Sequence, residues 1–211
     1  MKLYNANLSP NALRVRAVVN ELAIALEVID VDLRSGGNKT PEFLALNPNG
    51  KVPVLVDGDF VLWESRAINA YLAKMKPESG LYPADARKQA IIDQWSYWQA
   101  VHFGPTIQRL VFERVLKARF GRGEPDPKVV ESSMSEVAQL LPVLDASLAG
   151  KDWIIGALSL ADFAVGSTLV YASPAEISLA ETPNVAAWVK RLEARPSWQA
   201  ATAPVLAFLS S

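Results

Sequence analysis

The stretch at residues 47–66 constrains the fold more than any other part of the sequence. It contains two short runs rich in β-branched and aromatic side chains, residues 52–56 and 60–63, on either side of the pair Asp57-Gly58. An Asp-Gly pair between two such runs is a strong signal for a β-hairpin. Pro53 is compatible with this because it lies near the beginning of the first run, where a missing N–H is tolerated. The sequence therefore predicts a hairpin at this point of the chain.

A helix is predicted directly after the hairpin. Apolar residues at positions 68, 71, 72 and 75 recur at helical spacing, and Ser65 precedes them as the predicted N-cap. The hairpin would then bring Glu64 and Ser65 to a helix N-terminus, where unpaired N–H groups attract anions. From the residues alone, a capped helix without a ligand is the commoner interpretation, because caps far outnumber binding sites.

The beginning of the chain predicts a strand followed by a helix. The strand is expected at residues 2–4, and the helix begins with Ser9 as its N-cap and Pro10 in its first turn. This helix should turn its valines inward and its polar side chains, including Arg14 and Arg16, outward.

The remaining part before the hairpin completes an α/β layer. A second strand is expected at residues 27–31, and a polar, turn-rich loop at residues 36–42 leads into a short helix around Phe43. The order strand, helix, strand, hairpin and helix predicts a βαβ–ββα domain with a sheet of mixed strand direction.

Residues 77–85 form the one clear linker, because they are dense in residues that break helices. We therefore predict an α/β domain at residues 1–76, a linker at residues 77–85 and an all-α domain at residues 86–211. Gly104-Pro105 is expected to kink or break the first helix of the second domain, and Ser159 with Asp162 forms a capping-box pattern that we interpret as structural. Helical patterns lie at residues 87–119, 129–148, 159–171 and 185–194, with an apolar tail at residues 205–209.

Composition excludes several classes of function. With 21 basic and 22 acidic residues, the net charge of -1 gives no support for nucleic-acid binding. The absence of Cys rules out disulfides, a thiolate nucleophile and thiolate metal sites, and a single His rules out a His-rich metal cluster. Carboxylate metal sites are not excluded by composition, but we expect no metal.

The sequence also favours a protein that neither enters nor crosses a membrane. Three asparagines interrupt the region after Lys2, which argues against a secretory signal. No uninterrupted apolar run approaches the ~18 residues needed to span a bilayer. We therefore expect a cytoplasmic protein without a membrane partner.

Several segments of the sequence resemble a known family. Asn-Pro-x-Gly-x-Val-Pro-x-Leu at residues 47–55, followed by Glu-Ser-Arg-Ala-Ile at residues 64–68, resembles the glutathione-binding signature of the glutathione transferase family. Residues 8–15 are similar to the serine-type classes, theta and especially phi, and residues 110–117 resemble the corresponding phi-class segment. The resemblance implies a thioredoxin-like N-terminal domain, an all-helical C-terminal domain and glutathione as co-substrate. It also implies a homodimer that conjugates the glutathione thiolate to hydrophobic electrophiles in detoxification.

The resemblance makes Ser9 the candidate catalytic residue. A free thiol titrates near pH 8.5, so a hydroxyl donor and the positive end of the first helix would be needed to favour the thiolate. Each unit of pKa depression needs about 1.4 kcal/mol, and a charge-assisted hydrogen bond supplies roughly that much or more. The alternative is that Ser9 only caps the helix; a hydroxyl can also do both, because it accepts and donates at once.

Two lysines are candidate ligands for the glycyl carboxylate of glutathione. Where phi-like proteins carry a His-Lys pair, this chain has Asn38-Lys39, so the cation is present and the imidazole is not. Lys51 offers a second positive charge to the same carboxylate. As an alternative, both lysines are ordinary solvated surface charges.

By resemblance, the rest of glutathione is held by the hairpin and the helix after it. Val52 would form main-chain hydrogen bonds with the extended peptide, and the Val52–Pro53 bond would be cis. Ser65, together with its helix N–H, would bind the γ-glutamyl carboxylate, while Glu64 would face the amine.

A hydrophobic co-substrate pocket is the remaining expectation. His102 is the only side chain that titrates near neutrality, but no second group that would orient it as a base is identifiable, so we place it in the pocket. The expected pocket residues are Leu8, Leu33, His102, Thr106 and Phe112.

Two other functions stay open: a non-catalytic transferase-like interaction module, or a glutathione-dependent peroxidase, isomerase or dehalogenase at the same site.

Overall fold

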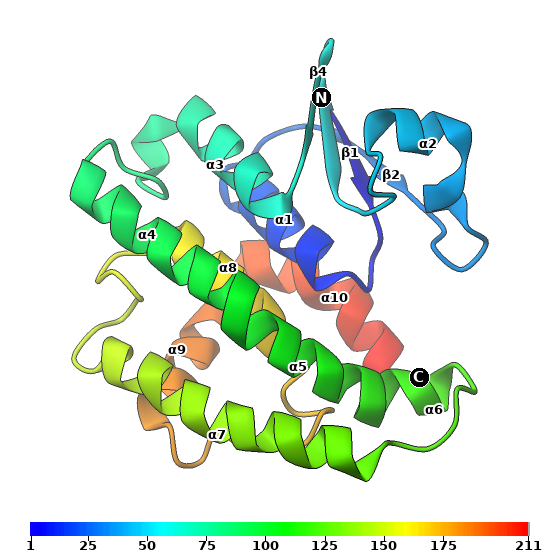
Figure 1. Cartoon of the computed structure of the whole chain (residues 1–211). Helices are drawn as coiled ribbons and strands as arrows, with labels where there is room; N and C mark the ends of the chain where they lie inside the picture. Colours follow the sequence, from blue (N-terminus) through cyan, green and yellow to red (C-terminus); the bar gives the residue numbers. More distant parts are fainter. Residues whose placement is uncertain (211) are drawn as a thin grey trace. The chain divides into compact units, whose positions relative to one another are not determined.

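The computed structural model describes residues 1–210, which divide into two compact units (Figure 1). Unit 1 consists of residues 1–82 together with the last helix, α10 (Pro196–Ser210), and unit 2 consists of residues 83–195. The boundary after residue 82 falls inside the predicted linker, but the C-terminal helix clusters with unit 1. This differs from the sequence-based division, which assigned all residues after 85 to the helical domain.

Unit 1 contains a four-stranded mixed sheet with the order β2-β1-β3-β4. Its strands are β1 (Lys2–Asn5), β2 (Glu27–Asp30), β3 (Val54–Asp57) and β4 (Phe60–Trp63). Strand β1 runs parallel to β2 and antiparallel to β3, and β3 pairs with β4 through a two-residue turn that begins at Gly58 with φ +62°. The predicted hairpin and the βαβ–ββα order are confirmed.

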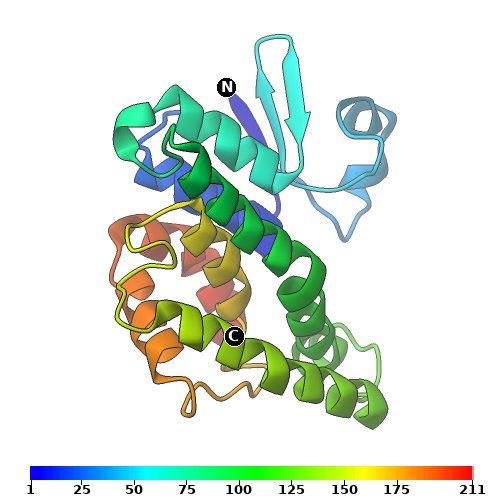
Figure 2. The ribbon, with the colours of Figure 1, turned by 60° about the vertical axis from the view of Figure 1, so that its left-hand side comes forward.

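Three helices and two short 3₁₀ turns complete the N-terminal part of unit 1. Helix α3 and helix α2 lie on opposite sides of the β3–β4 hairpin (Figure 2). Helix α1 packs against α3 and α10. Leu3, Leu13, Leu55 and Ile68 are fully buried between these elements, and each such side chain contributes about 1.5–3 kcal/mol through burial. The bounds are α1 (Pro10–Glu21), η1 (Gly37–Lys39), α2 (Pro41–Leu46), α3 (Ser65–Met75) and η2 (Pro77–Ser79).

Helix α10 is held on α1 by polar contacts as well as by apolar packing. Arg16 donates to the carbonyl of Ala201 at 2.9 Å, and the Asn20 amide donates to the carbonyl of Ser197 at 3.1 Å. The Ser197 hydroxyl in turn hydrogen-bonds the Glu21 carboxylate. The sequence predicted only an apolar tail here, because contacts between residues so far apart leave no local pattern.

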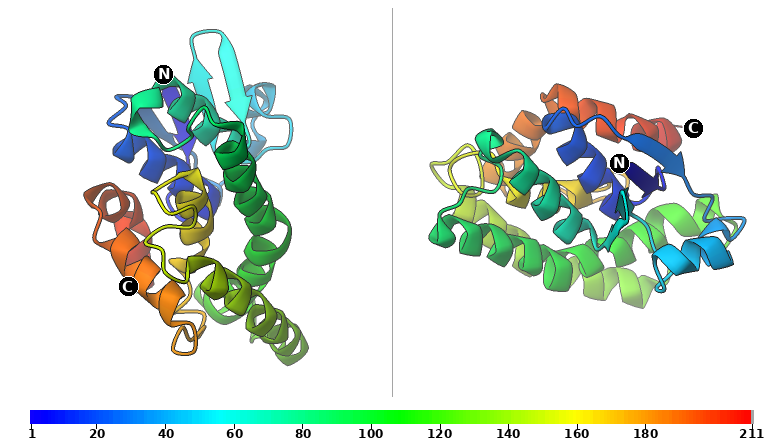
Figure 3. Two further views of the ribbon diagram at one scale, coloured as in Figure 1. Left: turned by 90° about the vertical axis from the view of Figure 1, so that its left-hand side faces the viewer. Right: turned by 90° about the horizontal axis from the view of Figure 1, so that it is seen from above.

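Unit 2 consists of helices and turns. Helix α4 leads through two π-helical turns, η3 and η4, into α5 and α6, so that the run appears as one bent column in Figure 3. The bounds are α4 (Ala86–Trp98), η3 (Gln99–Phe103), α5 (Gly104–Val111), η4 (Phe112–Leu116), α6 (Lys117–Arg119), α7 (Pro127–Leu148), α8 (Leu160–Leu169) and α9 (Pro183–Glu193).

Of the two outcomes expected at Gly104-Pro105, a kink or a break, the break is wrong, since the helical run continues through this pair directly after the π-helical turn η3. The wider turn of η3 lets the helical run continue through Pro105, which would otherwise clash with a carbonyl one turn earlier. Gly104 is needed for packing, since a Cβ atom there would lie 2.5 Å from the Gln99 amide nitrogen and 2.7 Å from its carbonyl oxygen. The buried Gln99 side chain uses the space to donate to Thr168 on α8 at 2.8 Å.

The capping box before α8 is confirmed as a structural element. One oxygen of Asp162 accepts from the Ile154 N–H at 3.0 Å and the Trp188 indole at 2.9 Å. The other accepts from the N–H and hydroxyl of Ser159 at 2.8 and 3.0 Å. Burial raises the pKa of Asp162, although these four hydrogen bonds oppose the shift.

Candidate active site

Ser9 lies at the N-terminus of α1, in the loop that follows β1. Its side-chain oxygen accepts a hydrogen bond from the Ala12 N–H at 3.2 Å, and its own N–H donates to the Ala6 carbonyl at 3.0 Å. The predicted cap is therefore present. Because the hydroxyl oxygen is the acceptor in this cap, its proton can be donated to another group. Ser9 is half-buried, which is compatible with access from solvent.

The N-terminus of α3 differs from the prediction. Ser65 is not the N-cap but the first helical residue, and the N-cap is Glu64, whose φ is +72° and whose side chain makes no capping bond within residues 1–210. A non-glycine residue held in a sparsely populated positive-φ conformation costs on the order of 1–3 kcal/mol, and such residues cluster at functional sites. The acid is exposed, whereas Ser65 is buried.

Ser65 is not the cap because its hydroxyl faces α1. It accepts a hydrogen bond from the guanidinium of Arg14 at 3.1 Å, inside unit 1. Arg14 is fully buried, and burial together with the neighbouring charge of Arg66 lowers its pKa, which the Glu64 carboxylate partly offsets. The buried guanidinium of Arg14 thus lies next to the N-terminus of α3.

The expectation that Arg14 and Arg16 point outward is wrong, since their exposed fractions are 0% and 9%. The sequence held a signal for this: residues 12–19 of α1 are otherwise all apolar, and a helix that is apolar on every side is a buried helix. Arginines inside such a helix must find acceptors in the interior. Sequence analysis therefore missed two polar side chains close to the candidate site.

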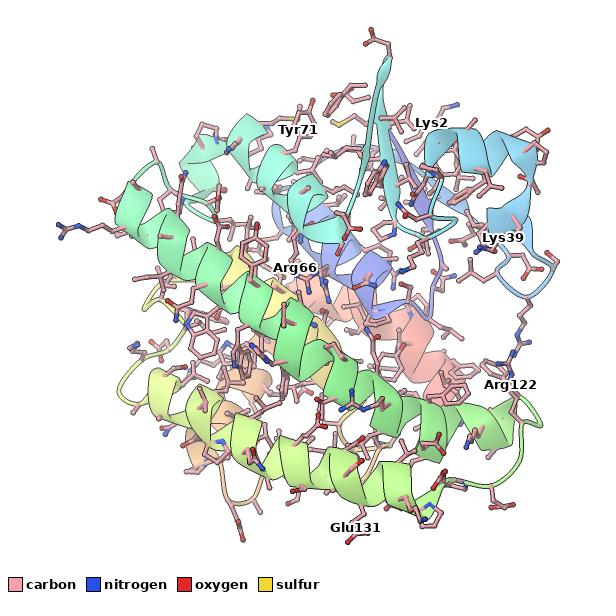
Figure 4. All side chains as sticks on the ribbon, viewed as in Figure 1. Lys2, Lys39, Arg66, Tyr71, Arg122 and Glu131 are labelled. Atoms are coloured by element: carbon pink, nitrogen blue, oxygen red, sulfur yellow. The ribbon has the colours of Figure 1, made fainter. Side chains whose placement is uncertain are left out.

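The loop around Lys39 is tied to the segment before β3. The Asn38 amide donates to the Gly50 carbonyl at 2.6 Å, and the Asn47 amide donates to the Lys51 carbonyl at 2.7 Å. Gly50 has φ +60°, and a Cβ atom there would lie only 2.8 Å from the Lys39 ammonium nitrogen. Asn38 thus has a structural role, while Lys39, at the edge of unit 1 in Figure 4, and Lys51 are exposed.

Val52 connects this segment to the loop of Ser9. The Val52–Pro53 bond is cis, as the resemblance implied, and Val52 precedes the first paired residue of β3, Val54. Its side chain lies in a buried cluster with Ala6, which precedes Ser9 by three residues, and with Phe43 of α2. The structure therefore brings the Ser9 loop, the cis-proline segment and α2 together.

The expected pocket residues divide between the two units. Leu8 and Leu33 belong to unit 1, whereas His102 and Phe112 belong to unit 2 and are exposed. Their shared pocket stays a prediction. Thr106, also in unit 2, is only 2% exposed, and its hydroxyl lies 2.6 Å from a carboxylate oxygen of Glu136. That hydrogen bond lowers the pKa of Glu136 and gives Thr106 a structural role.

Within residues 1–210, no three His, Cys, Asp or Glu side chains gather in a way that could hold a metal ion. None of the helices in this range combines the length and apolar character that crossing a membrane requires.

Comparisons with known proteins agree with this architecture. Residues 1–74 match the family described as glutathione S-transferase, N-terminal domain, and residues 102–196 match its C-terminal domain. The chain belongs to the glutathione S-transferase family. It is an enzyme, a glutathione transferase that uses glutathione as co-substrate. The thioredoxin-like domain followed by a helical domain, predicted from the sequence, is confirmed.

Relatives match over almost the whole chain. Glutathione S-transferase 3 of Zea mays is 40% identical over 97% of this chain and 94% of its own length. The probable glutathione S-transferase GSTF2 of Oryza sativa subsp. japonica is 35% identical over 94% of each chain. Among solved structures, a theta class glutathione S-transferase from Xanthomonas axonopodis pv. citri with glutathione bound has a TM-score of 0.87 at 32% identity, covering 95% of both chains.

Proposed function

We propose that this glutathione transferase activates glutathione at Ser9 and conjugates the resulting thiolate to hydrophobic electrophiles. The position of the Ser9 hydroxyl carries the proposal: its oxygen accepts the capping hydrogen bond of α1, so its proton would be available to a sulfur atom. A hydroxyl donor at a helix N-terminus stabilises an anion more than the neutral thiol, and this lowers the thiol pKa. The thiolate then attacks an electrophilic carbon, and the enzyme contributes ionisation and positioning.

The rest of unit 1 supports a binding mode for the whole peptide. Lys39 and Lys51, which are both exposed, would attract the glycyl carboxylate, and the main chain of Val52 would bind the extended peptide. Ser65 and the N-terminus of α3 would hold the γ-glutamyl carboxylate, with Glu64 facing the amine. The buried Arg14 supports this assignment, because it supplies positive charge behind Ser65.

We further propose that the protein is a cytoplasmic homodimer that acts in detoxification. Each unit exposes large apolar side chains that a subunit interface would bury. Sedimentation that shows a stable monomer at micromolar concentration would contradict the dimer. These exposed side chains include Phe60, Val61, Trp63 and Met75 in unit 1 and Ile91, Tyr97 and Val101 in unit 2.

The ultraviolet absorbance of the glutathione thiolate tests the function of Ser9. Glutathione is titrated into the protein at mildly acidic pH, where the free thiol is protonated. A saturable thiolate signal is the expected result. Binding without this signal would show a site that holds glutathione without activating it, and no binding would leave an interaction module.

Two variants separate the thiol donor from the cap. Ser9→Ala is expected to raise the pKa of the bound thiol and to lower turnover about tenfold, which corresponds to about 1.4 kcal/mol, with little change in glutathione affinity. Ser9→Gly removes the hydroxyl at a cost of only a few tenths of a kcal/mol to the cap. If Ser9→Gly keeps full turnover, Ser9 is only a cap.

A further inference from the structure

Arg16 lies on α1 about two helical turns beyond Ser9, and its side chain returns toward the loop that carries Ser9. One guanidinium nitrogen donates to the side-chain oxygen of Asn5 at 2.5 Å. The other donates to the main-chain carbonyl of Asn7 at 3.2 Å and to the carbonyl of Ala201 at 2.9 Å. A planar guanidinium can satisfy such divergent acceptors in one fixed geometry, which an ammonium cannot. Arg16 therefore holds both ends of the segment 5–7.

Asn5 and Asn7 extend these contacts to the end of β2. The buried Asn5 amide donates to Asp30 at 2.6 Å and to the side-chain oxygen of Asn7 at 3.0 Å. The Asn7 amide donates to the second oxygen of Asp30 at 3.3 Å. The carbonyl of Asn5 also accepts from the Val31 N–H at 2.7 Å. The network thus joins β1, β2, α1 and α10 through one short loop.

The same loop continues directly into the candidate catalytic residue. Ser9 donates its N–H to Ala6, which lies between the two asparagines that the network fixes. A shift of the Asn7 carbonyl would therefore move the main chain at Ser9. Misplacement of a reacting group by one ångström can cost a hundredfold in rate.

We propose that Arg16, through Asn5, Asn7 and Asp30, is a positioning residue that fixes the Ser9 hydroxyl against the glutathione sulfur. This makes helix α10 part of the scaffold of the site, because Arg16 binds α10 with the same nitrogen that holds the Asn7 carbonyl. Arg16 does not contact the thiol; it acts by limiting how far the loop can move. The inference rests on the proposed role of Ser9.

Arg16→Lys tests this role, since it keeps the charge and loses the planar fork. We expect the pKa of the bound glutathione thiol to rise by about one unit. At pH values below this pKa, the thiolate fraction is then roughly tenfold smaller. The KM for glutathione should change less than twofold, while kcat falls. Amide hydrogen exchange at residues 5–9 should accelerate. Asn7→Ala removes the side-chain hydrogen bonds of Asn7 with Asn5 and Asp30 but keeps the main-chain carbonyl that Arg16 binds, so it should produce a smaller change in the same direction.

Asn20→Ala is the matched control. Asn20 also lies on α1 and donates to a main-chain carbonyl of α10, but within residues 1–210 its side chain has no hydrogen bond to the loop at residues 5–9. It should leave the thiol pKa and the exchange at residues 5–9 unchanged. Equal effects of Asn20→Ala and Arg16→Lys would overturn the proposal, because α10 docking alone would then explain them.

The outcomes distinguish this proposal from the function of Ser9. A wild-type protein that binds glutathione without a thiolate signal overturns both. A wild-type signal that Arg16→Lys and Asn7→Ala leave unchanged, with unaltered exchange, overturns only the role of Arg16. The role of Arg16 is supported if Arg16→Lys and Asn7→Ala both raise the thiol pKa and accelerate exchange while Asn20→Ala does neither.

Discussion

Helices α3 and α8 both begin beside a serine and an acidic residue, yet only α8 closes its own N-terminus. At α8 the acid follows the serine by three residues, folds back and accepts four hydrogen bonds. At α3 the acid precedes the serine, is exposed and makes no capping bond within residues 1–210. At α3 the third residue after the serine is Ile68, so no acid is in position to complete a capping box.

The difference has a functional consequence. A sealed helix end satisfies its N–H groups internally and contributes to stability. An unsealed end leaves these groups for an anion, and at α3 the buried Arg14 adds charge to the same place. Glu64 keeps a positive φ there, which a merely structural helix start would not need. Unit 2 thus uses the motif for folding, and unit 1 is suited to use it for binding.

The largest expected effect comes from a substitution in the capping box of α8. Asp162→Asn turns one acceptor oxygen into a donor that faces the N–H and hydroxyl of Ser159. We expect the free energy of unfolding to fall by on the order of 3 kcal/mol, because the buried N–H and hydroxyl of Ser159 lose the oxygen that accepts from them and face another donor instead. Denaturant unfolding measures this. Ser132→Ala, at an exposed serine of α7, is the control and should stay within about 0.5 kcal/mol.

Arg14→Met should weaken glutathione binding at the N-terminus of α3. It removes the donor to Ser65 and the buried charge, and we expect the Kd for glutathione to rise about tenfold, or about 1.4 kcal/mol. Calorimetric titration with cysteinylglycine, which lacks the γ-glutamyl group, should show no comparable loss. An equal loss for both peptides would place Arg14 outside the γ-glutamyl subsite.

Glu64→Gly should have the smallest effect of the three substitutions. It should stabilise the protein, whereas Asp162→Asn should destabilise it. Glycine adopts a positive φ without strain, so the free energy of unfolding should rise by up to about 1 kcal/mol. Glutathione affinity should fall, because the partner of the amine is lost. Thermal unfolding and glutathione titration of the same variant separate the two effects. A variant that binds glutathione as tightly as the wild type would show that Glu64 is only a strained turn.

The sequence by itself determined the elements whose signals are local. Asp57-Gly58 specified the hairpin because glycine alone adopts the turn's left-handed φ without strain. Ser9 followed by Pro10 specified the start of α1, and Ser159 with Asp162 specified the start of α8. The signature at residues 47–68 also indicated the family. The signals for the hairpin and the two helix starts depend on residues only a few positions apart, so the sequence alone is enough to predict them.

Tertiary structure alone decided the roles of the two arginines, of Ser65 and of α10. Arg14 reaches an acceptor 51 residues away, and Arg16 reaches one 185 residues away. A guanidinium can leave water only where acceptors replace its hydration, and here distant parts of the chain supply them. The local pattern therefore predicted exposed arginines and a serine cap, whereas the folded chain buries both arginines and turns Ser65 toward Arg14.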